Sequence, residues 1–248
     1  MQFGSVAQHH RILDGSPGLD DTVRIAQETP HKEILGRLAK HPNYHIRRAV
    51  VVHGHKEHLD VLMHDPHSYV RSEVASTTTH KKHFAHLMND KNDDVRTLVA
   101  MYSPHKEHAM HMMHDENGEV GGALARRHPE THDHLANHPD EFVRQQVAIH
   151  SDGRHLDKLK NDPDKDVRTA VASRAVITGQ AHLHHHLMND PHPHVRVAVA
   201  ANTKDKDIAT HLTRDENQAV VTQAKKNLHI NHGDKSMLES FAEFTKTV

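Results

Sequence analysis

The sequence predicts an all-α protein, an α-solenoid of about eight to nine two-helix repeats of ~24 residues with a C-terminal capping helix. A short unit, represented by residues 161–172 with the sequence NDPDKDVRTAVA, recurs along nearly the whole chain. Its apolar residues recur at helical spacing, and an alternating strand pattern appears nowhere. Aromatic residues are only 3% of the 248 residues and Trp is absent, which suits thin stacked layers better than one thick core.

The repeats align on one aliphatic anchor residue that is usually followed by Arg. Successive anchors lie 23 to 28 residues apart, and a period of about 20–50 residues indicates a solenoid. The anchors are Ile46, Val70, Val95, Val120, Val143, Val167, Val195 and Val220. We therefore expect a lead-in over residues 1–20, the solenoid over 21–225 and a capping helix over 226–248.

The first helix of each repeat is expected to open at a Thr-Pro or Ser-Pro pair, such as Thr29-Pro30 and Ser103-Pro104. The hydroxyl would cap the helix and Pro would occupy its first position. Apolar residues three positions apart share one helical face and are predicted to point into the core. These pairs are Leu35/Leu38, Leu59/Leu62, Phe84/Leu87, Ala109/Met112 and Leu156/Leu159.

The second helix is expected to open at an Asp, often followed by Pro, as in Asp65-Pro66 and Asp162-Pro163. Asp can accept hydrogen bonds from the free N–H groups of the first turn and suits the positive end of the helix dipole. Valines four positions apart form its inward face, and the small residue Ala follows them. The pairs are Val70/Val74, Val95/Val99, Val143/Val147, Val167/Val171 and Val195/Val199.

The pattern Asp-Pro-x-x-x-Val-Arg-x-x-Val-Ala, followed by Thr/Ser-Pro and Leu-x-x-Leu, resembles the leucine-rich repeat variant family over roughly residues 20–225. The resemblance implies a right-handed helical solenoid, related in outline to HEAT repeats. The strand signature of true leucine-rich repeats is missing. The founding type of the family carries an amino-terminal iron–sulfur module, and that part does not carry over because this chain has no Cys.

Two places break the repeat, and the pattern ends after residue 225. Gly121 replaces the Arg that follows the anchor, and with Gly122 it is expected to loosen that helix by ~1 kcal/mol per Gly. The 28-residue interval contains a longer connection over residues 173–182. A last helix is predicted over residues 236–245 as the cap of the final layer, with docking of a partner as its alternative role.

One column of the repeat is basic, and two interpretations are open for it. Its members are Arg47, Arg71, Arg96, Arg144, Arg168 and Arg196. They could meet the phosphates of a nucleic acid at successive repeats. The favoured interpretation is a ladder inside the stack, in which each Arg bonds carboxylates or carbonyls of the adjoining repeat, because acidic neighbours such as Asp90 and Asp162 are abundant.

Histidine is the chain's most unusual feature, with 32 residues. At pH 7 about a quarter of unperturbed imidazoles are protonated, so the formal charge of −2 understates the positive charge. Neighbouring imidazoles on the first helices are candidate metal ligands. They are His55, His58, His80, His83, His105 and His108. No carboxylate or Cys completes a ligand set, so adventitious zinc or nickel binding or a pH-responsive surface is the expected consequence.

Composition and motifs exclude several function classes. Without Cys there are no disulfides, thiolate metal sites or Cys nucleophiles. No secretory signal and no apolar run of membrane-spanning length is visible, so a cytoplasmic protein is expected. The chain has no Gly-rich phosphate loop, no nucleophile elbow and no zinc-protease helix, so we expect no enzyme and no cofactor.

The sequence therefore predicts a non-enzymatic scaffold that binds another protein through an extended concave surface. Outward residues near the start of the second helices are the candidate contacts, because Tyr and Phe are typical interface anchors. They are Tyr44, His45, Tyr69, Phe142 and His194. The alternative is a nucleic-acid-associated solenoid that uses an Arg-, Lys- and His-lined groove. No membrane partner is expected, and the oligomeric state is open.

Overall fold

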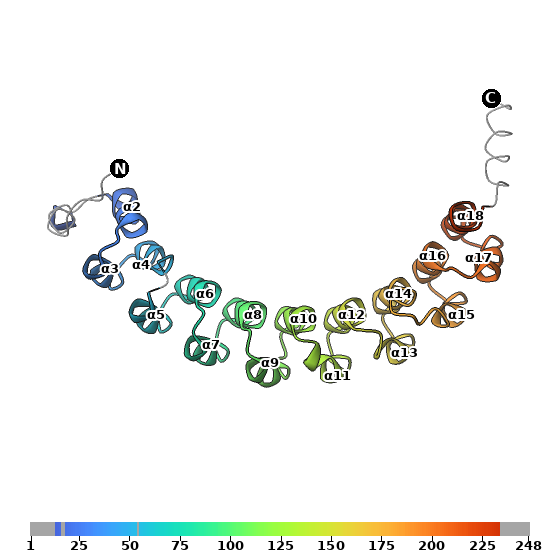
Figure 1. Cartoon of the computed structure of the whole chain (residues 1–248), viewed down its shortest axis with the longest axis horizontal. Helices are drawn as coiled ribbons and strands as arrows, with labels where there is room; N and C mark the ends of the chain where they lie inside the picture. The colour runs from blue at the N-terminus through green and yellow to red at the C-terminus, as the bar shows by residue number, and fades with distance from the viewer. Residues whose placement is uncertain (1–12, 16–17, 54, 234–248) are drawn as a thin grey trace, which may run out of the picture. The chain divides into compact units, whose positions relative to one another are not determined.

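The computed structural model describes residues 13–15, 18–53 and 55–233, and the regular structure in those ranges is entirely helical (Figure 1). This confirms the predicted all-α repeat solenoid. The chain divides into two units, Met1–Arg127 and His128–Val248. In each unit the helices alternate between two layers, and each helix of the second-helix layer packs against the next member of that layer.

The first unit contains nine of the described α-helices. Its second-helix layer consists of α2 (Leu19–Glu28), α4 (Tyr44–Val51), α6 (Ser68–Thr77), α8 (Asp93–Tyr102) and α10 (Gly118–Arg127). Its first-helix layer consists of α3 (Lys32–Leu38), α5 (Lys56–Leu62), α7 (Lys81–Leu87) and α9 (Lys106–Met112). Each first helix therefore connects two neighbouring second helices.

The second unit follows the same order, with first helices that are shorter except for α17. Its first-helix layer consists of η1 (Pro129–Thr131), α11 (His132–Leu135), α13 (Leu156–Leu159), α15 (Leu183–Leu187) and α17 (Lys206–Leu212). Its second-helix layer consists of α12 (Glu141–His150), α14 (Lys165–Arg174), α16 (Pro193–Asn202) and α18 (Gln218–His232). The expected boundary at residue 225 falls inside α18, and the helix predicted over residues 236–245 lies outside the described residues.

The predicted inward residues form the core of both units. The valine pairs of α6, α8, α12, α14 and α16 are all 0% exposed. The apolar pairs of the first helices are at most 3% exposed. Because burying one such side chain contributes about 1.5–3 kcal/mol, these pairs dominate the stability of the stack.

The first helices begin later than the sequence pattern predicts. The hydroxyl of Thr29 accepts a hydrogen bond from the N–H of His31 at 3.3 Å, and Ser103 accepts one from His105 at 3.3 Å. The helices then start one residue further on, with His as the N-cap residue. The Thr-Pro and Ser-Pro pairs therefore form turns before the helices. The prediction that they cap them is wrong, because these hydroxyls bond the backbone two residues ahead.

The prediction that the Asp of each Asp-Pro pair caps the second helix is also wrong. Oδ1 of Asp65 accepts from the N–H of His67 at 2.8 Å, and α6 begins only at Ser68. In α14 the cap is Asp164, two residues after Asp162, and its carboxylate accepts from the first turn of the helix. The Asp of each Asp-Pro pair thus shapes a turn before the helix, and this leaves most of its carboxylate for the Arg of the preceding repeat.

The two irregular places keep their helices. The helix α10 is continuous although Gly121 and Gly122 lie inside it and are buried. The extra residues of the 28-residue interval form turns between α14 and α15. Nε2 of Gln180 in this segment donates to the carbonyl oxygen of Gly153 at 2.6 Å. Gly153 has a φ of 103°, and a Cβ there would lie 2.9 Å from Thr178, so this contact requires glycine.

Candidate binding surface on the second helices

The Arg column is part of the stack. Nε and Nη2 of Arg71 donate to the two carboxylate oxygens of Asp90 in the next repeat, at 2.6 and 2.7 Å, and Nη1 donates to the carbonyl oxygen of Asp65 at 2.8 Å. Both side chains are nearly buried. The equivalent bidentate pairs are Arg47–Asp65, Arg96–Asp115, Arg144–Asp162, Arg168–Asp190 and Arg196–Asp215. We call these pairs the Arg–Asp clamps.

The clamp between Arg71 and Asp90 favours the charged form of both residues. The hydrogen bond with Asp90 raises the pKa of Arg71. Burial opposes ionisation of Asp90, but the hydrogen bonds from Arg71 and from the Asn92 amide outweigh it, so the pKa of Asp90 is lowered. The structure confirms the ladder inside the stack. The alternative of a phosphate-binding column is wrong for these six arginines, because each guanidinium already binds a carboxylate.

Three of the six candidate metal-binding histidines are core residues. His58, His83 and His108 are 8%, 0% and 3% exposed, so this row is not the surface feature that the sequence suggested. Burial lowers the pKa of each of them. The same holds for His155 and His184 in the second unit. The imidazoles of this row are therefore neutral parts of the first-helix core.

His83 has a partner at each ring nitrogen. Nε2 lies 3.0 Å from Oδ1 of Asp60, and Nδ1 lies 2.6 Å from the hydroxyl of Thr78. Because a carboxylate only accepts, Nε2 carries the proton and Nδ1 accepts from the hydroxyl. The hydroxyl–imidazole–carboxylate series resembles a catalytic arrangement, but Thr78 and His83 are 6% and 0% exposed. Its evident role is to satisfy a buried imidazole.

The other three candidate ligands lie beside the buried row. His55, His80 and His105 are half-buried and contact His58, His83 and His108 edge-on, with ring centroids 5.9, 5.2 and 5.0 Å apart. Within the described ranges no group of three or more His, Asp or Glu side chains is arranged to hold a metal ion. A metal-binding role for these six histidines stays a prediction.

Three of the candidate partner-binding residues come together in the first unit. The ring of Tyr44 lies 4.0 Å from that of His45 and 6.2 Å from that of Tyr69. The ring of His67 completes the group, stacked on Tyr44 at 3.7 Å with an interplanar angle of 6°. We call these four residues the aromatic cluster. His67 is not among the predicted site residues, although its position in a turn two residues before Tyr69 was an available signal.

The remaining two candidates lie in the second unit on different helices. Phe142, at the start of α12, is half-buried. His194, at the start of α16, is exposed, and its ring contacts that of His192 at 4.9 Å. Both residues hold the same place in their repeats as Tyr69, directly before the anchor valine. Each is therefore at the exposed edge of its second helix.

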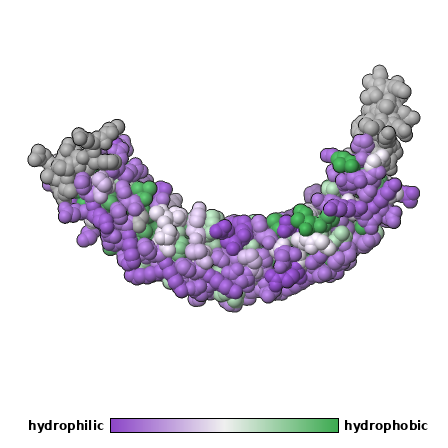
Figure 2. Space-filling view, in the orientation of Figure 1, coloured by the Kyte–Doolittle hydropathy of each residue, from purple (hydrophilic) through white to green (hydrophobic). Residues whose placement is uncertain are grey.

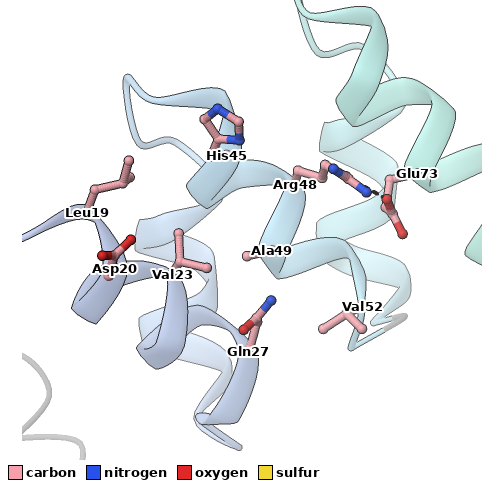
Figure 3. Close-up of a pocket in the computed structure, with 9 residues that line it drawn as sticks. All are labelled: Leu19, Asp20, Val23, Gln27, His45, Arg48, Ala49, Val52 and Glu73. Carbon is pink, nitrogen blue, oxygen red and sulfur yellow. Dashed lines mark hydrogen bonds and ion pairs between the residues drawn. The ribbon is translucent and has the colours of Figure 1, made fainter.

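A groove of about 370 Å³ adjoins the aromatic cluster (Figure 3). Its apolar wall consists of Leu19 and Val23 of α2, Ala49 of α4, and Val52, the C-cap residue of α4. Leu19 and Val52 are 46% and 59% exposed. On the side of α6, the ion pair between Arg48 and Glu73 borders the groove, at 2.7 Å. The groove also includes His45, so it is continuous with the cluster.

Charged side chains are spread over the first helices, whereas some second helices have uncharged middle positions. The first helices carry exposed ion pairs from repeat to repeat, such as Lys32–Glu57, Lys81–Glu107 and Lys82–Asp60. In four second helices the two positions after the Arg of the column carry no charge. In α8, α12, α14 and α16 they are Thr97, Leu98, Gln145, Gln146, Thr169, Ala170, Val197 and Ala198, of which Gln146, Ala170 and Ala198 are buried. In Figure 2 the most hydrophobic patches accordingly lie over second helices.

Comparison with solved structures supports the fold. No family model and no curated protein matches the sequence. The structure is similar to that of a leucine-rich repeat variant, with 23% sequence identity and a TM-score of 0.66 over 90% of this chain and 87% of the other. YibA of E. coli has 17% identity and a TM-score of 0.43 over 94% and 92% of the two chains. A designed armadillo repeat protein has 15% identity and a TM-score of 0.30 over 86% and 100%.

These observations define the class of the protein as a repeat α-solenoid. The predicted likeness to the leucine-rich repeat variant is confirmed at the level of the fold. No helix in the described part of the chain is long and apolar enough to cross a membrane.

Proposed function

We propose that the chain is a non-enzymatic scaffold that binds another protein through the exposed side of its second helices. The observation that carries this proposal is the aromatic cluster beside a groove with an apolar wall, both on second helices of the first unit. The middle positions of α8, α12, α14 and α16 are also uncharged. Interfaces are depleted in charged residues at their centre and enriched in aromatic ones.

The proposed contacts are the residues that begin the second helices. In the first unit they are Tyr44, His45 and Tyr69, which share one surface. In the second unit they are Phe142 and His194, which occupy equivalent places in α12 and α16. Because Tyr and Phe lose little side-chain entropy on binding, they are efficient anchors for a partner segment.

Two observations support a binding role over the other classes considered. The one hydroxyl–imidazole–carboxylate series described above is buried, so a substrate has no access to Thr78 or His83. The Arg–Asp clamps occupy the guanidinium groups of the Arg column, so this column is not available to the phosphates of a nucleic acid. A protein segment makes no demand on either.

A peptide-library selection tests this function. The full chain is immobilised with chelator and nuclease present, and random peptides are selected against it. We expect enriched peptides that bind the wild-type chain and bind Tyr44→Ala/Tyr69→Ala or Phe142→Ala variants more weakly. The matched control is Tyr102→Ala, which removes a tyrosine that is also exposed but lies at the far end of α8. No enrichment, or binding that none of the site variants weakens, would contradict the proposal.

A further inference from the structure

The aromatic cluster offers ring faces without a fixed positive charge. Tyr69 is 57% exposed, and the rings of Tyr44 and His67 lie between it and the groove residue His45. Nδ1 of His67 accepts a hydrogen bond from the N–H of Tyr69 at 3.3 Å, where the imidazole is the N-cap of α6. Ring faces of this kind attract cations, Arg more often than Lys.

The next two second helices place carboxylates at the equivalent edge. Asp94 in α8 and Glu119 in α10 stand directly before the anchor valine, as Tyr69 does in α6. Both are exposed, and neither forms an ion pair with a described Lys, Arg or His side chain. Asp93 adds a third carboxylate, which accepts from the side chain of Asn117 at 2.8 Å. Along this edge of the first unit, the aromatic side chains of α4 and α6 are therefore followed by acidic side chains of α8 and α10.

We infer that this edge of the first unit binds an extended, basic segment of a partner protein. An Arg of the segment stacks on the aromatic cluster, and a second Lys or Arg pairs with Asp94. An apolar side chain on the other flank enters the groove between α2 and α4. The inference rests on the proposed function and assigns the charge and order of the partner's residues.

The spacing of the helices sets the spacing of the segment. Neighbouring packed helices lie about 8–10 Å apart. An extended chain advances about 3.3 Å per residue. Successive contacts on α4, α6 and α8 are therefore about three residues apart, which gives the order apolar-x-x-Arg-x-x-Lys or Arg.

Charge complementarity favours this occupant over a nucleic acid. Bases can stack on Tyr69, but the phosphates beside them would face Asp93, Asp94 and Glu119. A guanidinium combines a planar face for the rings with a positive charge for the carboxylates. Both halves of the edge are then used by one ligand.

Fluorescence polarisation of labelled peptides with the full chain tests the inference. The probe contains Leu-Ser-Ser-Arg-Ser-Ser-Lys in a Gly/Ser background, and it should bind with an affinity that falls as salt rises. Citrulline in place of the probe's Arg keeps the shape and removes the charge, so it should weaken binding about fivefold. Glu in place of its Lys should weaken binding about as much.

Variants of the protein locate the contact. Tyr69→Ala should weaken binding of the probe about two- to fivefold, and Asp94→Lys about tenfold. The matched controls are Tyr102→Ala and Glu33→Gln, an exposed tyrosine and an exposed carboxylate away from this edge. Both should leave binding of the probe unchanged. Circular dichroism of each variant checks that its helices persist.

The inference is overturned if the citrulline peptide binds as tightly as the probe, or if neither site variant weakens binding. It is also overturned if single-stranded RNA binds at this edge in place of the probe. Failure here and failure of the proposed function are separate outcomes. If the library enriches uncharged peptides that bind the second helices, the inference of a basic segment is wrong but the proposed scaffold function stands. If the library enriches nothing, the proposed scaffold function is itself wrong.

Discussion

The two layers of helices differ in how closely their repeats agree. The second helices α6, α8, α10, α12, α14 and α16 each have ten residues. The first helices α3, α5, α7, α9 and α17 have seven residues, whereas α11, α13 and α15 have only four or five. The regular layer contains the Arg–Asp clamps and the valine pairs. The variable layer contains the buried histidines.

The difference shows which interactions set the repeat. The second helices from α6 to α16 keep the same length, and they share an inward apolar pair and the turn before the helix, even in α10, where Gly121 replaces the Arg. A first helix needs only two inward residues three positions apart, and it tolerates Pro129, Gly153 or an insertion before it. The outward residues of the second helices are then free to vary without loss of the stack, which suits a binding surface.

The largest expected effect is a loss of folding stability in acid, caused by the buried histidines of the first helices. Burial lowers the pKa of His58, His83, His108, His155 and His184 below the unfolded value. The unfolded chain therefore binds more protons, and the stability present above about pH 6.5 is lost as the pH falls. Each imidazole that stays neutral costs about 1.4 kcal/mol between pH 7.5 and 5.5, with an upper limit of about 7 kcal/mol for all of them. Urea unfolding at both pH values measures this, and equal stability would contradict it.

Removing one residue of an Arg–Asp clamp should destabilise the packing of the second helices. Arg71→Ala leaves Asp90 charged and nearly buried, so we expect a loss of about 3–5 kcal/mol in the free energy of unfolding. The matched control is Arg154→Ala, whose ion pair with Asp152 has both side chains more than 60% exposed, so its loss should change the free energy of unfolding far less. Thermal unfolding compares the two. Similar losses would show that the clamp is not a buried, stabilising pair.

A smaller gain in stability is expected from replacing a buried histidine of the first helices with the isoleucine that other repeats have at that position. Ile34 and Ile208 occupy the place in α3 and α17 that His58 occupies in α5. Nε2 of His58 is buried without a hydrogen-bond partner. His58→Ile should therefore stabilise the chain by about 1 kcal/mol at pH 7.5 and reduce its acid sensitivity. If the variant unfolds at lower urea concentration than the wild type, the imidazole has a partner that this account omits.

The smallest expected effect is that of metal removal. Both ring nitrogens of His83 already have partners, and one nitrogen of His108 bonds Ser103 at 2.8 Å. Binding a metal at His83, or at Nδ1 of His108, would require these hydrogen bonds to break. We therefore expect the Tm measured with chelator to equal the Tm measured with micromolar zinc, after removal of any affinity tag. A zinc-dependent rise in Tm that His55→Ala abolishes would restore the metal hypothesis.

Much of the core could be predicted because it follows from periodicity. Residues such as Val95 and Leu59 repeat at fixed positions, so their burial needed no knowledge of the neighbouring helices. The helix starts could not be placed, because Thr29 and Asp65 bond the backbone ahead of the helix instead of capping it. The burial of His58 was hidden by its polarity, although Ile34 at the same position was an indication.

The candidate site was predictable only as separate residues. The sequence identified Tyr44 and Tyr69 as outward residues, but their contact depends on how α4 packs on α6. The stacking of His67 on Tyr44 depends on the turn before α6. The groove likewise depends on side chains of α2, which belongs to a degenerate repeat with no clear anchor.

The central claim is that the second helices bind the partner, whereas the first helices support the second helices. The most direct test is an amide chemical-shift titration of the full chain with a peptide from the library selection. We predict shifts concentrated at the starts of second helices, among Tyr44, Tyr69 and Asp94 if the basic segment is the ligand. Shifts concentrated in the first helices α5, α7 and α9, with the second helices unchanged, would contradict the claim.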